Sequence, residues 1–579
     1  MIRKLTHGDR TVAKIVFVVT LAVLLLGSRT QGNTRDEGTY FDAAEHYWSW
    51  YGDLADNLLA GHPQRSFTRA AIDRGFSDNH EHPALMKSLF GLSWRIFHRC
   101  HCPEQAGRHP LPYPHKHLTL GLLDEETAFR LPTHIVTAFM AVCLFLMGAA
   151  AWSRAAGLVA AALAIAAPRL FFDAQLAAFD APIAAWWVIV VYAYWRALDE
   201  PDWAWRAGVL FGCALASKHN AFFIPFALAP HFLFVAWQRR HLPSLRPFIY
   251  MATLGVLVYF VLWPWLWFDT VNRFRDYMAF HVHHVYYNME YLGHNYNKPP
   301  FPISFPYVMT LFTLPVTTLV LAVAGAVLLI LDWKRLRRIN PDAGRELGTR
   351  ATGLLIGINA LFPMAILTVT RAPIFGATKH FHATIPYLAL LAGYAVYVLA
   401  RTLAGIPSNA VDQRTLVPAE QTKRAGLFAA ALAVVVCAPA VAETYRAHPY
   451  ELSHYNLLAG GPAGGADLGL NRQFWGYATR GVLPWIDEHA GPRAPVYWHD
   501  TNQLQLNMHV REGRLRPDIG NTGLEENGVR ASNIALVIHE KHFNKYEYWI
   551  WDFYGTTRPS LVLDDEGVPL VTLYERPRK

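Results

Sequence analysis

Two adjacent carboxylates, Asp36 and Glu37, directly follow the first long apolar segment of the chain. Behind them, in residues 40–58, aromatic and aliphatic residues recur every three or four positions, which predicts an amphipathic helix. A carboxylate held beside a membrane surface can act as a general base that takes the proton of a hydroxyl group. Acidic residues also stabilise the first turn of any helix through its dipole, so the spacing alone supports both interpretations.

A second polar cluster lies in residues 78–87 and contains two imidazoles, His80 and His82, together with Lys87. The imidazoles could bind a metal ion, although they do not show a defined ligand spacing. A lysine at this depth either extends its ammonium group to the interface or supplies a point charge for a phosphate.

Further charged residues are distant in sequence but lie at helix ends that we expect on the same face of the membrane. Each of them alone is explained by anchoring at the interface or, for an aspartate, by the start of a helix. Together they could form a site for a lipid phosphate. The residues are Arg130, Asp180, Lys218, His219, Arg371, Lys379 and His380.

The segment 281–300 is rich in histidine and tyrosine, with His281, His283 and His284 close together. Three nearby imidazoles permit a metal site. A loop of histidines and tyrosines is equally suited to stacking and hydrogen bonding with a sugar. The sequence leaves both interpretations open.

The composition indicates which elements position these side chains. Of 579 residues, 53% are apolar and 17% are charged, against about 25% charged in soluble proteins. This excludes a disordered, collagen-like or coiled-coil chain. A membrane span needs about 20 mostly apolar residues. Eleven segments approach that length: 13–29, 131–152, 155–172, 178–195, 203–217, 221–237, 247–268, 306–333, 352–370, 381–400 and 425–442.

The distribution of basic residues predicts the orientation of these spans. With the N-terminus in the cytoplasm, twenty lysines and arginines fall on the inner side and six in short outer loops. The net charge of +8 therefore reflects orientation in a lipid bilayer, and we expect no nucleic-acid partner. The first span, with no small-residue cleavage site after it, is expected to be a retained anchor. Residues 82–98 are expected to form an amphipathic helix on the outer interface.

The predicted fold is an α-helical polytopic membrane protein with a small α/β domain at the C-terminal end. Residues 1–442 form the membrane domain, including a long outer loop at 31–129, and residues 443–579 form an extracytoplasmic domain. In the latter the apolar runs shorten to strand length at 494–499, 533–539 and 560–574, after a helical pattern.

The order of motifs over roughly residues 13–400 resembles the polyprenyl-phosphate-sugar-dependent glycosyltransferases of the type C membrane fold. The nearest branch is glycosyltransferase family 39, which includes the protein O-mannosyltransferases. The tail resembles the C-terminal extension of bacterial members. The motifs are DEGTYFDAAEHY, HPALMK, RLPTHIVTAFMAVCLFLM, LAAFDAPIAAWW, GVLFGCALASKHN and RAPIFGATKHFHATIPY.

The resemblance implies roles for individual residues. Asp36 and Glu37 would be the catalytic pair, with Asp36 as the base. His82-Pro83 matches a His-Pro-Pro motif in which Ala84 replaces the second proline. No residue is assigned to a metal and no cofactor is expected with certainty, although a divalent cation is possible. The donor phosphate would be held by Lys87, Lys218, Arg371, Lys379 and His380, and the rest of the substrate by His82, Arg130, Asp180 and His219.

The chemistry agrees with such an enzyme. A sugar on a polyprenyl phosphate already has a good leaving group, so one base and nearby cations suffice. A glycosidase needs two carboxylates because its leaving group is an alkoxide. We therefore expect inverting transfer from a polyprenyl-phosphate sugar to a hydroxyl of a lipid, glycan or protein acceptor, at the outer face of the cell inner membrane.

Two other classes of protein remain as alternatives. A polytopic transporter or flippase of lipid-linked sugars would often show paired repeats and charges near the membrane midplane. This sequence shows no repeat, and its charges lie at the outer helix ends. A non-catalytic assembly protein that uses the tail as a binding module is the other alternative.

Overall fold

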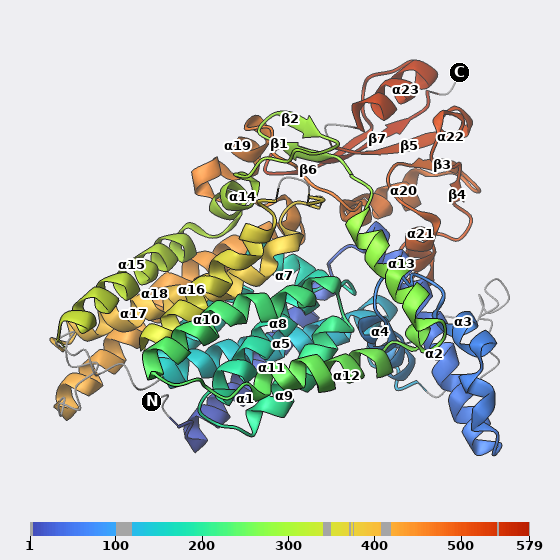
Figure 1. Ribbon diagram of the computed structural model, residues 1–579. Coiled ribbons are helices and arrows are strands. Elements are labelled where there is room, and N and C mark those ends of the chain that lie inside the picture. The colour runs from blue at the N-terminus through green and yellow to red at the C-terminus, as the bar shows by residue number, and fades with distance from the viewer. Residues whose placement is uncertain are drawn as a thin grey trace.

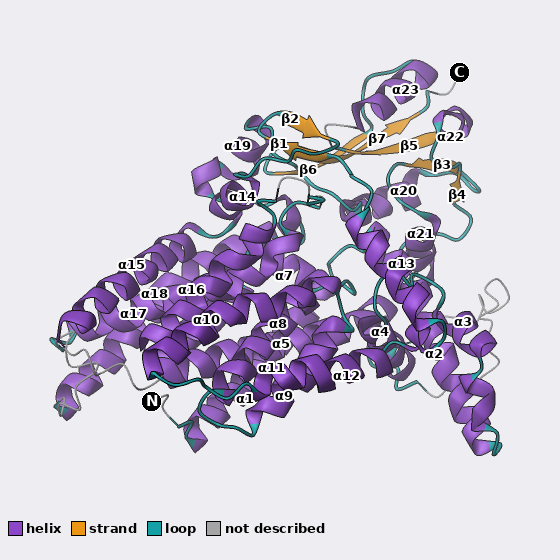
Figure 2. Ribbon diagram, in the orientation of Figure 1, coloured by secondary structure: helices purple, strands orange, loops and turns teal. Residues whose placement is uncertain are grey.

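The computed structural model describes residues 4–99, 119–339, 349–369, 372–374, 376–406, 418–540 and 543–577. Most of these residues are helical, and the strands gather at one end of the molecule, away from the N-terminus (Figures 1 and 2). The prediction of a mainly helical membrane protein with a small sheet region near the C-terminus is confirmed.

Each of the eleven apolar segments is mainly helical in its described residues, as one helix or as several consecutive helices. Within the described residues, five helices are long and apolar enough to cross a membrane, or seven if each of two bent pairs counts as one span. The other segments form shorter or less apolar helices, so the total of eleven crossings stays a prediction. The helices are α1 (His7–Ser28), α5 (Glu125–Ala151), α6 (Arg154–Ile165), α7 (Pro168–Ala174), α8 (Asp180–Ala197), α9 (Trp203–Leu215), α10 (Ile224–Arg239), α11 (Arg246–Tyr250), α12 (Val256–Val261), α14 (Phe305–Thr313), α15 (Val316–Ile339), α16 (Thr349–Ile366), α17 (Ile385–Leu403) and α18 (Ala419–Ala447).

The bent pairs are α6 with α7, at 75°, and α14 with α15, at 120°. Pro168 begins α7, where its missing N–H costs nothing, and a proline also lies between α14 and α15. Thus two of the predicted spans are broken helices in the structure.

The connection between α1 and α5 contains α2 (Arg35–Leu59), α3 (Arg69–Phe76) and α4 (Leu85–Phe97). Thr34 and Glu37 begin α2 with a capping box, in which each side chain accepts the backbone N–H of the other residue. Tyr40 and Tyr47 lie on the buried face of α2, as the apolar spacing predicted. The predicted amphipathic helix at 82–98 corresponds to α4.

The C-terminal sheet has the strand order β4-β3-β5-β7-β6. Its central strand β5 pairs in parallel with β3 and antiparallel with β7. The predicted strand region 560–574 is a hairpin, because Glu566 and Gly567 both adopt positive φ and reverse the chain. The elements are β3 (Pro495–Trp498), β4 (Gly520–Asn521), β5 (Ile534–Ile538), β6 (Leu561–Asp565) and β7 (Val568–Glu575), with α20 (Leu483–His489), α21 (Gln503–Arg511), α22 (Glu526–Ala531) and α23 (Asn544–Tyr554).

The histidine-rich segment forms the end of α13 (Thr270–Val282) and a short hairpin of β1 (Met289–Tyr291) and β2 (His294–Tyr296). Leu292 and Gly293 form its turn, both with positive φ. The backbone N–H of Gly293 donates to the carbonyl of Gly469, which joins this hairpin to the C-terminal region.

Ion pairs attach the C-terminal region to α2 and to α5. Arg511 lies 2.6 Å from Glu45 of α2 and also pairs with Glu125 at the start of α5. Arg514 pairs with Glu126, whose side chain is 1% exposed. The orientation of the C-terminal sheet against the membrane helices therefore depends on charged groups that are largely removed from water.

We expect Arg511→Met to loosen this attachment, because it leaves Glu45 and Glu125 without their common partner. Breaking a buried ion pair typically costs about 3–5 kcal/mol. Limited proteolysis should release the C-terminal region faster than in the wild type. Arg530→Met is the control, since Arg530 forms a solvent-exposed pair with Glu526, worth about 0–1 kcal/mol. Equal rates of proteolysis in the two variants would contradict the proposed role of Arg511 in this attachment.

The same interface predicts a dependence of stability on pH. Burial and the neighbouring Glu126 raise the pKa of Glu512 from 4.5 to about 7. Because the folded state binds this proton more tightly, the stabilisation is present below pH 4.5 and is lost as the pH rises through 7. We expect the Tm to fall over this range, and Glu512→Gln to reduce the fall by about 3 °C. An unchanged slope in the variant would exclude Glu512 as the titrating group.

Candidate functional site

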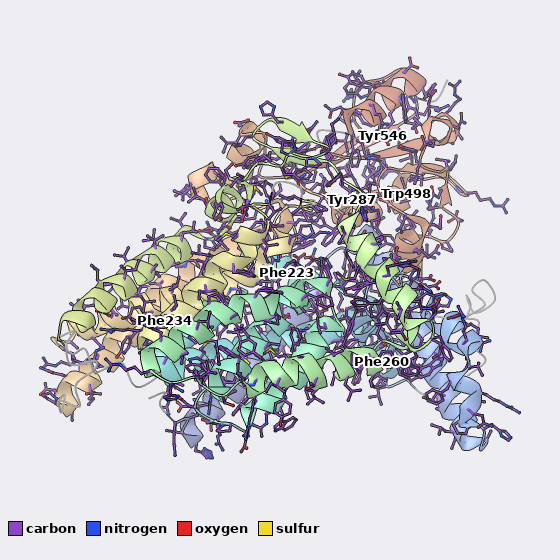
Figure 3. All side chains as sticks on the ribbon, in the orientation of Figure 1. Phe223, Phe234, Phe260, Tyr287, Trp498 and Tyr546 are labelled. Atoms are coloured by element: carbon purple, nitrogen blue, oxygen red, sulfur yellow. The ribbon has the colours of Figure 1, made fainter. Side chains whose placement is uncertain are left out.

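A cavity of about 900 Å³ lies between one end of the membrane helices, the connection between α1 and α5, and the C-terminal region. Phe223 and Tyr287, labelled in Figure 3, belong to its lining. Segments distant in sequence contribute its polar side chains. These include Arg35, Asp36, Glu81, His82, Asp180, Lys218, His219, His281, Lys379, His380, Asp500 and Glu540.

Asp36 lies in the first turn of α2 and its side chain lines the cavity, with 31% of it exposed. The indole N–H of Trp475 donates to Oδ2 of Asp36 at 2.8 Å. Oδ1 lies 3.6 Å from Nε of Arg35, which is beyond hydrogen-bond length. Arg35 in turn donates to Asp500 of the C-terminal region. Asp36 is therefore fixed at one oxygen and accessible from the cavity.

The neighbouring Glu37 has a different environment, because its side chain is fully buried. Both of its oxygens accept from the guanidinium of Arg130 at 2.8 Å. The backbone N–H groups of Thr34 and Ala177 donate to the same carboxylate at 3.0 and 2.7 Å. Glu37 and Arg130 thus join α2, α5 and the segment before α8, and neither lines the cavity.

Lys218 and Asp180 form a buried pair in the cavity wall. Nζ of Lys218 lies 2.5 Å from Oδ1 of Asp180, the first residue of α8. His219, which follows Lys218 in the sequence, stacks on His281 of α13 with ring centroids 4.0 Å apart. Asp180 therefore holds an ammonium group at the helix ends that surround the cavity.

Lys379 and His380 line the cavity from the 3-10 helix η6 (Lys379–Thr384), which leads into α17. The ammonium of Lys379 lies over the ring of Trp475, 4.0 Å from its centroid. A smaller pocket shares Asp180, Lys379 and His380 with the main cavity and continues it toward the membrane helices. The structure thus brings Lys379 together with Lys218, as the sequence analysis expected, whereas Arg371 lies outside the described residues.

The side chain of Lys87 contacts the loop before α4 and not the cavity. Its ammonium donates to the carbonyls of Asn79 and His82 and to Oδ1 of Asn79, and it packs over Tyr47. Burial lowers its pKa to about 7. Lys87 braces the loop in front of α4 and does not line the cavity.

Two histidines in the cavity wall are held in the neutral form. Burial, with the nearby charges of Lys87 and Lys218, keeps the pKa of His82 well below its usual value. Burial also lowers the pKa of His281 to about 4. Near neutral pH these imidazoles offer N–H and N groups for hydrogen bonds without carrying a positive charge.

The histidines for which the sequence left a metal site open do not form a set of three ligands within the described part of the chain. Among the described residues, the one group with three potential ligand atoms within 4.8 Å is Asp42, His46 and Asp78. His46 and Asp78 are partly exposed, Asp42 is exposed, and none of the three lines the cavity.

Sequence reasoning missed four cavity residues: Arg35, Trp475, Asp500 and Glu540. Burial and the nearby Asp500 and Glu290 raise the pKa of Glu540 well above its usual value. Arg35 is adjacent to Asp36 in the sequence. The other three residues lie in the C-terminal region, and no local sequence pattern indicates that they pack against the start of α2. The one available sequence signal was the aromatic pair Phe474–Trp475 before Gly476, and it is a weak one.

The molecule is a multi-pass membrane protein with a polar cavity at one end of its helices. Residues 117–267 match the family of dolichyl-phosphate-mannose-protein mannosyltransferases. The match covers α5 to α12, including Asp180 and Lys218, and confirms over this segment the class predicted from the motifs, a glycosyltransferase. Asp36 and Lys379 lie outside the matched residues.

Solved structures with a similar arrangement have low sequence identity. ArnT from Cupriavidus metallidurans, bound to undecaprenyl phosphate, is 14% identical, with a TM-score of 0.49 over 96% of this chain and 97% of that one. AglB from Archaeoglobus fulgidus, an archaeal oligosaccharyltransferase, is 10% identical, with a TM-score of 0.45 over 95% of this chain and 72% of that one. The comparison with curated proteins gives no match.

Proposed function

We propose that this protein transfers a sugar from a polyprenyl-phosphate donor to a hydroxyl group of a lipid, glycan or protein acceptor. The observation that carries the proposal is the single cavity that contains Asp36 together with Lys218 and Lys379. A carboxylate and two ammonium groups from distant segments are what a base-assisted displacement of a phosphate requires. The family match across α5 to α12 supports the same reaction class.

In the proposed reaction Asp36 accepts the proton of the acceptor hydroxyl. The acceptor oxygen forms a bond to the anomeric carbon while the bond from that carbon to the phosphate oxygen breaks. The phosphate leaves with the bonding electron pair as polyprenyl phosphate. A single displacement of this kind inverts the configuration of the sugar.

Lys218 and Lys379 are the proposed partners of the donor phosphate, since their charges stabilise the negative charge that develops on it. His380 follows Lys379 in the sequence, and His82 and His219 line the same cavity. We propose Asp180 as the group that holds Lys218. Arg371 remains a prediction, whereas Lys87, Glu37 and Arg130 support the surrounding structure.

The location follows from the charge distribution and the position of the cavity. We propose that the chain lies in the cell inner membrane with its N-terminus in the cytoplasm. Residues 443–579 then form a periplasmic or extracellular domain over the cavity. This places the reaction at the outer face, where the loop 31–129 also lies.

The test uses purified protein in lipid vesicles with labelled undecaprenyl-phosphate sugars and an extract of membrane glycans and proteins as acceptors. Label that appears on an acceptor, with release of undecaprenyl phosphate, supports the proposal. Movement of the labelled donor across the vesicle without transfer would instead support a transporter. Neither transfer nor movement, with every donor tried, would favour an assembly protein.

We expect Lys379→Met to weaken binding of undecaprenyl phosphate about 10- to 100-fold, because a hydrogen bond to a charged group contributes about 1.5–3 kcal/mol. The affinity can be measured by microscale thermophoresis in detergent. Lys298→Met is the matched control, since Lys298 is exposed and does not line the cavity. Equal affinities of the two variants would remove Lys379 from the proposed phosphate site.

A further inference from the structure

Trp475 belongs to the C-terminal region, yet it lies between Asp36 and Lys379 in the cavity. Its indole N–H donates to Asp36 at 2.8 Å, and its ring lies 4.0 Å from the ammonium of Lys379. The side chain is 4% exposed and lines the cavity. One residue thus contacts both the proposed base and a proposed phosphate ligand.

The backbone of Trp475 is held in a conformation that a side chain of this size rarely adopts. Its φ is +75°, in the left-handed region, and that of Gly476 is +68°. Such a conformation costs free energy and persists where the surroundings impose it, often at functional sites. Here the carbonyl of Trp475 accepts the backbone N–H of Arg35 at 2.8 Å.

The next residues fix this segment further. A Cβ atom on Gly476 would approach the carbonyl oxygen of Asp500 to 2.6 Å, so the chain passes close to Asp500. The side chain of Gln505 donates to the carbonyls of both Asn33 and Gly476. The turn at Trp475 is therefore built against the start of α2.

From this geometry we propose that Trp475 is a positioning residue, which orients the carboxylate of Asp36 through its N–H and the ammonium of Lys379 through its ring. The proposal rests on the proposed function of these two residues. Trp475 fixes Oδ2 of Asp36, so the proton of the acceptor passes to the other oxygen, Oδ1. It also keeps the base and the phosphate ligand in a constant relative position.

The proposed role of Trp475 gives the C-terminal region a part in the chemical step. This region completes the arrangement of the base, because the donor to Asp36 comes from residue 475 and no other hydrogen bond to its side chain is found within the described residues. Residues 443–579 would then be required for the chemical step as well as for any contact with an acceptor.

The test compares Trp475→Phe, which removes the N–H and keeps a ring beside Lys379, with Trp498→Phe. Trp498 is also buried in the C-terminal region, and its N–H donates to the carbonyl of Gly520, away from the cavity. For sugar transfer we expect kcat of Trp475→Phe to fall about 10- to 100-fold, with little change in KM. The acid limb of its pH–rate profile should move to higher pH, because the ionised carboxylate has lost a donor. Trp498→Phe should show neither change.

A second measurement needs no substrate. Ultraviolet resonance Raman spectra of the indole N–H should differ between the wild type and Asp36→Asn, and this difference should disappear when Trp475 is phenylalanine. Absence of the difference would contradict the contact. An unchanged pH–rate profile in active Trp475→Phe would overturn the positioning role alone. A wild type that transfers no sugar, yet shows the spectral difference, would overturn the proposed function and with it the positioning role.

Discussion

Replacing Asp36 with asparagine is expected to reduce kcat for sugar transfer about 10²- to 10⁴-fold, the contribution typical of a general base. Asparagine has nearly the same shape and can still accept the N–H of Trp475, but it cannot take the proton of the acceptor. The affinity for undecaprenyl phosphate should change little, because the proposed phosphate ligands Lys218 and Lys379 remain. Rates with labelled donor and equilibrium binding measure the two effects separately.

Asp42→Asn is the matched control for this substitution. Asp42 lies on the same helix, α2, its side chain is 48% exposed, and it does not line the cavity. Its variant should retain wild-type kcat. If Asp36→Asn kept full activity at normal expression, another group would have to be the base, and the proposed mechanism would be wrong.

Replacing the adjacent Glu37 with glutamine is expected to affect stability first, because the substitution removes the closest counter-charge of the buried Arg130 and leaves only Glu126, 4.0 Å away. Removing one partner of a buried ion pair typically costs about 3–5 kcal/mol. The loss should appear as a lower Tm and a lower midpoint of chemical unfolding in detergent. Glu420→Gln is the control, since its pair with Arg424 is exposed and worth about 0–1 kcal/mol.

A double variant keeps the prediction for Glu37 testable if the single variant does not fold. Glu37→Leu with Arg130→Met removes both buried charges and should recover part of the stability, because neither partner is left unpaired. Activity lost at unchanged stability in Glu37→Gln would instead assign Glu37 a direct chemical role, as the sequence analysis first expected.

The sequence predicted those features of the structure that depend on neighbours along the chain. Apolar periodicity and segment length marked every helix of the bundle, because a helix in lipid must satisfy its backbone internally and present apolar side chains outward. The alternation of apolar runs likewise marked β3, β5 and the region of β6 and β7, but not β4. The motifs indicated the reaction class, and the family match over residues 117–267 confirms it for that segment.

The roles of chemically similar residues were decided only by the tertiary structure. Asp36 and Glu37 are both acidic and adjacent, yet one faces the cavity and the other is enclosed by Arg130. Lys87 and Lys379 are both lysines near helix starts, but the ammonium of Lys87 donates to backbone carbonyl groups, whereas Lys379 lines the cavity. Burial and partners come from segments hundreds of residues away, so no local pattern distinguishes the members of either pair.

The sequence by itself thus determined a helical membrane protein, its class and a set of charged residues that included the proposed base. The tertiary structure decided which of those charges share a cavity, and it added Trp475 from the C-terminal region beside Asp36. The physical reason is that the spacing of residues encodes secondary structure locally. The environment of a charged group, in contrast, depends on contacts that form only when distant segments pack together.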